Sequence, residues 1–221
     1  NELLIITIAK EIHDYENVVL GVGIPMTSGA VAKALFAPHA TLMMESGMID
    51  FKPTLPVNHV ADCLSCRGFS FSTDLFSIFT MAYREFVDVC FLGVAQVDKY
   101  GNINTTVIGD YENPTLRLPG SGGAADFISY AKRTSKLIST QGIFEFDPVT
   151  KEMYLSKLHP GVSVEAVKKN VPWDLKVSPD LTQTKRPTDD EIDFIRRFFP
   201  TESVGKNLVD ELAIARLAKG K

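Results

Sequence analysis

The carboxylate of Glu45 is a candidate catalytic group because of the residue types on either side of it in the sequence. Glu45 comes directly after an apolar segment, residues 41–44, and directly before a Ser46–Gly47 pair at which the chain can turn. Such a run predicts a buried strand of an α/β sheet, and these sheets bind ligands beyond the carboxyl ends of their strands. Gly47 allows positive φ or close approach of a ligand. Glu45 is therefore a candidate catalytic carboxylate; the alternative is a residue that only caps or pairs at the strand end.

A glycine-rich segment later in the chain forms a second candidate site. Residues 119–126 read Pro-Gly-Ser-Gly-Gly-Ala-Ala-Asp and lead into a helical pattern over residues 127–132. Unpaired amides at a helix N-terminus, together with the helix dipole, can hold an anion or a developing oxyanion. A simple tight turn explains this segment equally well when it is taken alone. The residues concerned are Gly120, Ser121, Gly122 and Gly123.

An earlier glycine-rich turn has only part of a dinucleotide-binding pattern. Gly21 and Gly23 match the first two glycines, but Met26 occupies the third position. No acidic residue apart from Glu45 follows where a ribose contact is expected. We therefore do not expect NAD to bind here.

The pair Cys63 and Cys66 could form a redox couple or half of a zinc site. The chain contains no second pair, Cys90 lies alone in an apolar segment, and His59 precedes the pair by only four residues. We therefore expect ordinary buried thiols and no bound metal. The remaining histidines show no ligand spacing, and one of them opens a turn at His159-Pro-Gly.

Size and composition favour a globular cytoplasmic protein. The 221 residues are 45% hydrophobic, enough for a substantial core, and they carry a net charge of −4. That charge argues against a nucleic-acid surface. No apolar segment approaches the roughly 20 residues of a membrane span, and no cleavable signal peptide is evident. Three cysteines are an odd and low number for a disulfide-bonded secreted protein, so a reducing cytosol is the expected compartment.

Hydrophobic periodicity places both candidate motifs on an α/β framework. The first part reads helix, strand, Gly-rich turn, helix, strand, which is a βαβ unit with a right-handed crossover. A later helix carries a Phe and Met stripe that we expect to be core, and a capping box opens another helix near the C-terminus. Helices are expected over residues 2–13, 27–36, 73–87, 162–170, 188–199 and 206–221, strands over 18–20, 41–44, 89–97 and 174–177, and a hairpin over 137–158.

These motifs, in this order, resemble the β subunits of class I CoA-transferases, with the pattern of glutaconate CoA-transferase. The matches cover most of the chain, and Glu45-Ser-Gly coincides with the family's nucleophile motif. The resemblance implies an α/β fold with an open, mostly parallel sheet and flanking helices, the CoA-transferase (NagB/RpiA-like) fold. It also implies one domain over residues 1–221, with a C-terminal tail at 201–221. The matching segments are residues 21–25 with 31–33, 37–38, 45–50, 93–98 with 100–104, 108–111, 120–123, and 142–147 with 153–155.

The resemblance further implies an activity and a role for each candidate residue. Glu45 would be the nucleophile that carries a glutamyl-CoA thioester while CoA moves from an acyl-CoA to a free acid, possibly glutaconate or another short dicarboxylate. A CoA thioester is then a substrate, with no permanently bound cofactor and no metal. Gly120, Ser121, Gly122 and Gly123 would lie at the acyl thioester as oxyanion and acyl-CoA contacts. The supporting residues would be Ser46, Gly47, Gln96 and Asn104.

A homologous α subunit is the implied partner, in an α2β2 or larger assembly with the active site between the subunits. Neither nucleic acid nor a membrane is an expected partner. Relatives that act as CoA-ester hydrolases or decarboxylases look to have replaced the nucleophilic glutamate, so Glu45 favours transfer over these alternatives. A non-catalytic ligand-binding subunit of the same fold is a further alternative; the intact Glu45 and the lack of a helix-turn-helix count against it.

The chain departs from the family pattern at one place. The family has a few dozen further residues between the positions matching Arg133 and Ser135. The flanking matches stay good on both sides, and a βαβ sheet loses a strand only at high cost. We therefore expect that the sequence closes over a segment there.

Overall fold

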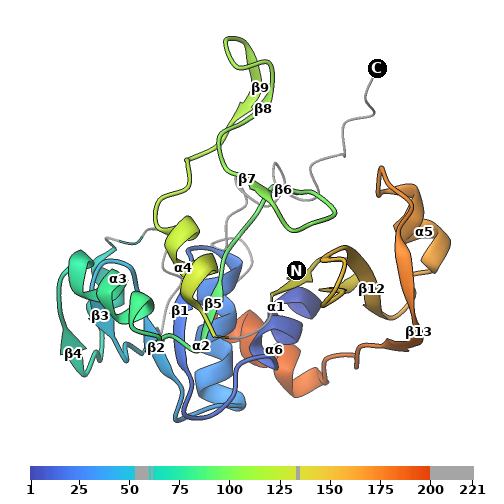
Figure 1. Ribbon diagram of the computed structural model, residues 1–221. Coiled ribbons are helices and arrows are strands. Elements are labelled where there is room, and N and C mark those ends of the chain that lie inside the picture. The colour runs from blue at the N-terminus through green and yellow to red at the C-terminus, as the bar shows by residue number, and fades with distance from the viewer. Residues whose placement is uncertain (53–59, 61, 133–134, 200–221) are drawn as a thin grey trace. The chain divides into compact units, whose positions relative to one another are not determined.

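The computed structural model describes residues 1–52, 60, 62–132 and 135–199 (Figure 1). Contacts within the chain divide it into two compact units. Within the described ranges, the first unit comprises residues 1–93, 123–132 and 187–199, and the second comprises residues 94–122 and 135–186. The single domain expected from the sequence stays a prediction. The expected tail helix and the departure at Arg133 lie outside the described residues.

The first unit is built on a five-stranded mixed sheet. β1 pairs in parallel with β2 on one side and with β5 on the other, so that Val19 stands opposite both Met43 and Cys90. β3 pairs antiparallel with β2 and with β4. The α/β class with flanking helices is confirmed, and the antiparallel edge arises because the chain reverses after Met44 instead of crossing over. In spatial order the strands are β4 (Phe71–Ser72), β3 (Met48–Ile49), β2 (Thr41–Met43), β1 (Asn17–Leu20) and β5 (Val89–Phe91).

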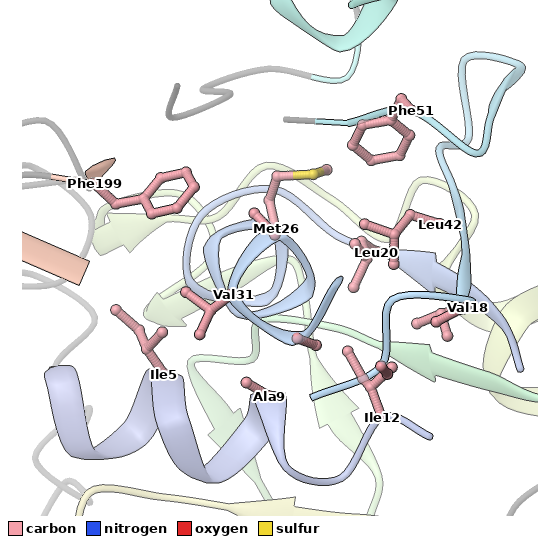
Figure 2. Close-up of a cluster of buried hydrophobic side chains, with 14 of the residues drawn as sticks. Ile5, Ala9, Ile12, Val18, Leu20, Met26, Val31, Leu42, Phe51 and Phe199 are labelled. Atoms are coloured by element: carbon pink, nitrogen blue, oxygen red, sulfur yellow. The ribbon is translucent and has the colours of Figure 1, made fainter. Parts of the chain in front are cut away.

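The helices α1, α2 and α6 cover one face of this sheet. Figure 2 shows Ile5 and Ala9 of α1 on the side of α2 that carries Val31, with Leu20 of β1 to the right of α2. Burial of these apolar side chains stabilises the unit by roughly 1.5–3 kcal/mol for each fully buried large residue. The Thr188 and Glu191 capping box is present at the start of α6. The bounds are α1 (Glu2–Ala9), α2 (Ile24–Leu35) and α6 (Asp189–Phe198).

α2 begins three residues earlier than its periodicity predicted. Gly23, with φ +82°, forms the N-cap, and Pro25 stands in the first turn, where its fixed φ suits a helix and its missing N–H costs nothing. The Gly-rich turn that follows β1 is therefore short. The helix consequently starts at the carboxyl edge of the parallel strands.

α3 (Leu75–Tyr83) and α4 (Ala124–Tyr130) cover the opposite face. Ile78, Ala82 and Phe127 form that layer together with Val19 and Met43. The expectation that the whole Phe and Met stripe of α3 is core is wrong, because a short helix over a narrow sheet buries only one side. The large exposed residues of α3 and the turn after it are Leu75, Phe76, Tyr83 and Phe86, and those of α4 are Ile128 and Tyr130.

The second unit consists of two hairpins and a four-stranded sheet packed on one helix. The expected hairpin is confirmed as β11 and β12, and β13 adds to it in parallel. The expected strand over residues 89–97 divides at Gly93 into β5, in the first unit, and β6. The elements are β6 (Gln96–Val97), β7 (Ile103–Asn104), β8 (Val107–Gly109), β9 (Pro114–Arg117), β10 (Lys136–Ile138), β11 (Gly142–Phe146), β12 (Met153–Leu158), α5 (Val164–Lys169) and β13 (Lys176–Gln183).

The core of the second unit contains Phe144, Leu155 and Leu175, with Val167 from α5. The predicted turn after His159 is confirmed, since the amide of Val162 donates to its carbonyl oxygen over 3.1 Å. No helix in the described part of the chain combines the length and apolar character needed to cross a bilayer.

Candidate active site

Glu45 lies in a tight turn at the carboxyl end of β2. The amide of Met44 still pairs with the carbonyl of Met48 over 2.9 Å, and the amide of Gly47 donates to the carbonyl of Met44 over 3.0 Å. Glu45 and Ser46 are therefore the two central residues of a β-turn between β2 and β3. The Glu45 side chain is half-buried. The strand-end position that the sequence pattern indicated is thus the one observed.

Gly47 fixes this turn against the start of α3. Its φ is +105°, and a Cβ built on it would lie 1.9 Å from the carbonyl oxygen of Thr73. The amide of Thr73 in turn donates to the carbonyl of Gly47 over 2.9 Å. Only glycine fits here, because any side chain would displace the backbone of residue 73.

The same edge of the sheet carries the start of α2. β1 runs into Gly21, whose amide donates to the carbonyl of Phe91 over 2.8 Å, and α2 follows from Gly23. The positive end of the α2 dipole therefore lies at the edge where β2 delivers Glu45. In a parallel sheet, the strand ends and the starts of the helices that follow them lie at the same edge, which explains why α2 begins near Glu45.

Cys90 is a neighbour of Glu45 that the sequence did not reveal. It lies on β5 and packs with the α3 and α4 side of the sheet. Burial, and after it the negative charge of Glu45, raises the pKa of the Cys90 thiol to about 12. The thiol is therefore neutral at physiological pH. No local signal could have found this pair, because Cys90 lies 45 residues further along the chain in an ordinary apolar strand.

The hydroxyl of Ser46 is buried and, within the described part of the chain, makes no hydrogen bond. A buried hydroxyl without a partner is costly, typically about 1–3 kcal/mol. Since Ser46 adjoins Glu45, this hydroxyl is a donor available to a group that enters the site.

A partly buried ion pair braces the segment that follows Glu45. The ammonium of Lys33 donates to Oδ1 of Asp50 over 2.5 Å and to the carbonyl of Ala40 over 2.6 Å, and Ser70 donates to Oδ2 of Asp50. Burial opposes the charge of Asp50, but these donors outweigh it and hold its pKa below the ordinary value. Lys33 and Asp50 both fall in segments that carried the family resemblance, and the structure shows that they contact each other.

The glycine-rich loop contributes residues to both units. Gly123 is the buried N-cap of α4 in the unit that contains Glu45, while residues 120–122 are exposed and belong to the second unit. Gly120 and Gly122 adopt positive φ, which explains the choice of glycine. The amide of Gly120 already donates to the carbonyl of Thr105 over 2.9 Å, so it is not a bare donor. The role of this loop as an oxyanion site stays a prediction.

Gln96 and Asn104 are joined to each other in the second unit. Nδ2 of Asn104 donates to Oε1 of Gln96 over 2.8 Å and to the carbonyl of Val107 over 2.7 Å. Oδ1 of Asn104 accepts from the amide of Thr106 over 3.0 Å. These bonds brace β6, β7 and the turn after them. Their expected role as substrate contacts stays a prediction.

Cys63 and Cys66 occupy a short 3-10 helix, and both are free and exposed. The expectation that they are buried is wrong, because both thiol side chains lie at the surface of their unit. His59 lies outside the described residues. Across the residues that the structure does describe, no three His, Cys, Asp or Glu side chains gather closely enough to hold a metal ion.

The first unit is thus an α/β layer structure, and the turn between β2 and β3 places the carboxylate of Glu45 at the carboxyl edge of the parallel strands. Residues 1–139 match the family model described as Coenzyme A transferase. The chain belongs to the coenzyme A transferase family, which confirms the resemblance seen in the motifs.

Three relatives define the neighbourhood. The chain is 30% identical to the B subunit of 3-oxoadipate CoA-transferase from Pseudomonas knackmussii, over 89% of this chain and 91% of the relative. It is 29% identical to the B subunit of glutaconate CoA-transferase from Acidaminococcus fermentans, over 80% and 84%. The crystal structure of that glutaconate CoA-transferase superposes with a TM-score of 0.83, covering 92% of this chain and 95% of that one. The decarboxylase AibA/AibB superposes with a TM-score of 0.82 at 25% identity, covering 96% and 97%.

Proposed function

We propose that this chain is the β subunit of a heteromeric CoA-transferase, and that Glu45 is the nucleophile that carries CoA between two carboxylic acids. The observation that carries this proposal is the position of Glu45. It is a half-buried carboxylate in a β-turn, at the carboxyl edge of the parallel strands and beside the start of α2. Family membership supports the reaction class.

A carboxylate suits this reaction because it conserves the energy of the thioester. A carboxylate oxygen of Glu45 attacks the carbonyl carbon of an acyl-CoA, the C–S bond breaks, and CoA leaves as a thiolate. The thiolate then attacks the glutamyl carbonyl of the mixed anhydride, which releases the free acid and leaves a glutamyl-CoA thioester. An acceptor carboxylate runs the same two steps in reverse, so no external energy is needed.

Each addition places negative charge on a carbonyl oxygen, which requires donors within the site. The amides of Gly122 and Gly123 are the proposed donors, worth roughly 3 kcal/mol each by analogy with known oxyanion holes. The hydroxyl of Ser46, which has no hydrogen-bond partner among the described residues, is a further donor next to the nucleophile. The amide of Gly120 is engaged with Thr105, so Gly120 acts through the shape of the loop.

A homologous partner subunit completes the site. Anhydride and thioester intermediates are hydrolysed unless water is excluded, and Glu45 is only half-buried in this chain. Both transferase relatives are B subunits by name, and the decarboxylase is named for two components, AibA and AibB. We infer an assembly of α2β2 type or larger, working in the cytoplasm, where free thiols such as Cys63 and Cys66 persist.

The acid substrates are short dicarboxylates under this proposal. Glutaconate and 3-oxoadipate, after which the two transferase relatives are named, are both dicarboxylic acids. The second candidate function is decarboxylation or hydrolysis of a CoA ester.

The observation that supports this second candidate is the structural likeness to the decarboxylase AibA/AibB.

The deciding experiment looks for the covalent intermediate. The chain is co-expressed with its partner subunit, incubated with a panel of acyl-CoAs without an acceptor acid, and analysed by intact mass and peptide mapping. A CoA adduct on the peptide containing Glu45 establishes a transferase, and the acyl-CoA that forms it identifies the donor. The Glu45→Gln complex is the matched control and should acquire no adduct.

Other outcomes separate the alternatives. Free CoA that accumulates without an adduct indicates a hydrolase. An acyl-CoA that loses the mass of carbon dioxide indicates a decarboxylase. If no acyl-CoA of the panel changes in any of these ways, Glu45 is not catalytic, and a ligand-binding subunit is the favoured function.

A further inference from the structure

The sides of α3 and α4 that face away from the sheet carry an exposed aromatic cluster. The side chains of Phe76, Tyr83 and Tyr130 are 79%, 67% and 37% exposed. α3 and α4 pack against each other (Figure 1), and between them lies an open pocket of about 220 Å³. Clusters of large exposed apolar residues on a folded chain mark interaction surfaces. We call this site the aromatic pocket; its lining is Phe76, Phe79, Thr80, Tyr83, Asp126 and Tyr130.

Three rings of the aromatic pocket, those of Phe79, Tyr83 and Tyr130, make contacts with other rings. Tyr83 and Tyr130 meet edge to face, with centroids 5.1 Å apart and planes at 72°. Phe79 stacks on the buried Phe127 at 5.0 Å. Rings that are already ordered lose little conformational entropy when a partner binds. Tyrosine is also among the residues that most often dominate binding energy at interfaces.

Asp126 determines the charge of the guest. It is the one charged side chain among the six that line the aromatic pocket. Within the described residues it forms no hydrogen bond or ion pair through its carboxylate. A carboxylate beside the negative faces of aromatic rings attracts a cation and repels an anion. An anionic CoA ester is therefore a poor guest for this pocket, whereas a lysine or arginine side chain is a good one.

The aromatic pocket is also linked to the candidate active site within the first unit. α3 follows directly from Asp74, its N-cap, and the preceding residue Thr73 is bonded to Gly47 in the Glu45 turn. A chain seated on α3 and α4 would thus rest on the segment that positions the nucleophile. A site that needs a second subunit to exclude water would be covered from this direction.

We propose that the aromatic pocket receives a lysine or arginine side chain of the partner subunit, so that α3 and α4 form part of the heteromeric interface. The existence of that partner rests on the proposed function. The guest cation lies against Tyr83, Tyr130 and Phe76 and pairs with Asp126, while the flanking apolar residues exclude water from the pair. The partner surface therefore carries a basic side chain surrounded by apolar ones.

The test measures the affinity of the two subunits with purified full-length chains. Phe76→Ala combined with Tyr83→Ala should raise the dissociation constant by roughly tenfold or more. Asp126→Asn should raise it by roughly threefold to tenfold and should flatten its dependence on salt, since the ion pair is lost. Tyr15→Ala removes a ring that is 78% exposed elsewhere in the first unit, and this control should leave the affinity unchanged. Far-UV circular dichroism verifies that every variant is folded.

Three outcomes would overturn the inference. Unchanged affinity in both the double variant and Asp126→Asn rejects the interface. If the Asp126→Asn complex is weaker but depends on salt as the wild-type complex does, the ion pair between Asp126 and a basic partner side chain is rejected. An isolated chain that forms a homodimer, lost in the Phe76 and Tyr83 variant, assigns the surface to a second copy instead.

CoA labelling of Glu45 in the wild-type complex is read separately. If the wild-type complex is labelled and the variants bind the partner subunit as tightly as wild type, the interface inference is rejected and the proposed function is kept. If the variants bind the partner more weakly but the wild-type complex is never labelled, the interface is kept and the transferase function is rejected.

Discussion

The amide of Thr73 donates a 2.9 Å hydrogen bond to the carbonyl oxygen of Gly47, and this contact ties the start of α3 to the turn that carries Glu45. A Cβ on Gly47 would lie 1.9 Å from the carbonyl oxygen of the same threonine. The position of Glu45 therefore depends on the absence of a side chain two residues away, at Gly47.

Gly47→Ala should destabilise the protein by about 3 kcal/mol or more, because the new methyl group collides with backbone and residue 47 must keep φ near +105°. Gly120→Ala is the matched control, since Gly120 has φ +94° but open space around its Cβ position. That variant incurs only the backbone strain, about 1 kcal/mol. Chemical denaturation of both variants measures the difference. Equal losses would show that the contact between residues 47 and 73 is unimportant for stability.

Glu45→Asp should reduce CoA transfer by roughly a hundredfold or more, because the shorter side chain withdraws the carboxylate by about one bond length from its point of attack. Steady-state kinetics of the complex with its partner subunit test this, with Glu112→Asp, an exposed glutamate, as the control. Unimpaired turnover by the Glu45 variant would exclude this residue as the nucleophile.

Cys90 should resist alkylation by iodoacetamide in the folded protein at about pH 8, while Cys63 and Cys66 react. Burial and the charge of Glu45 raise the pKa of Cys90 to about 12, and only the thiolate is a good nucleophile. Cys63 and Cys66 are exposed and free. Peptide mass mapping after labelling, with and without denaturant, reads each cysteine by itself. Rapid labelling of native Cys90 would contradict the burial of this thiol, which is the main cause of its raised pKa.

Asp50→Asn should lower the free energy of unfolding by about 1–3 kcal/mol at pH 7, because Lys33 then keeps a largely buried charge without its counter-ion. The pKa of Asp50 is lowered in the folded state from its ordinary value of 3.8. Its contribution is therefore complete above that pH and is lost as the pH falls through the folded pKa.

The difference between wild type and Asp50→Asn should accordingly shrink below about pH 3.8. Urea titrations across this pH range measure it, and Asp180→Asn, at an exposed site in β13, serves as the control. A difference that stays constant into strongly acidic solution would mean that Asp50 acts through packing and not through its charge.

The local sequence pattern was sufficient to predict most of the helices and strands. The strand before Glu45, the capping box of α6 and the hairpin of β11 and β12 all lie where periodicity and turn residues indicated. These features depend on neighbours within a few positions along the chain, so the sequence contains the information directly. The same holds for the motif order that indicated the CoA-transferase family.

Burial was predicted less well, because an apolar residue does not specify what covers it. Phe76 of α3 lies outward, and Cys63 and Cys66 are exposed, although the sequence predicted interior positions for all three. Helix length and sheet width decide how many sides of a helix are covered, and neither is a local property. In this protein, the exposed surplus of aromatic residues is the basis of the proposed partner surface.

The sequence by itself determined the family, the nucleophile candidate and the elements that carry it. Only the tertiary structure placed Cys90 beside Glu45, paired Lys33 with Asp50 and set Thr73 against Gly47. These partners are separated along the chain by up to 45 residues, and strand order and register bring them together. Such contacts arise from the packing of whole elements, which no short segment encodes.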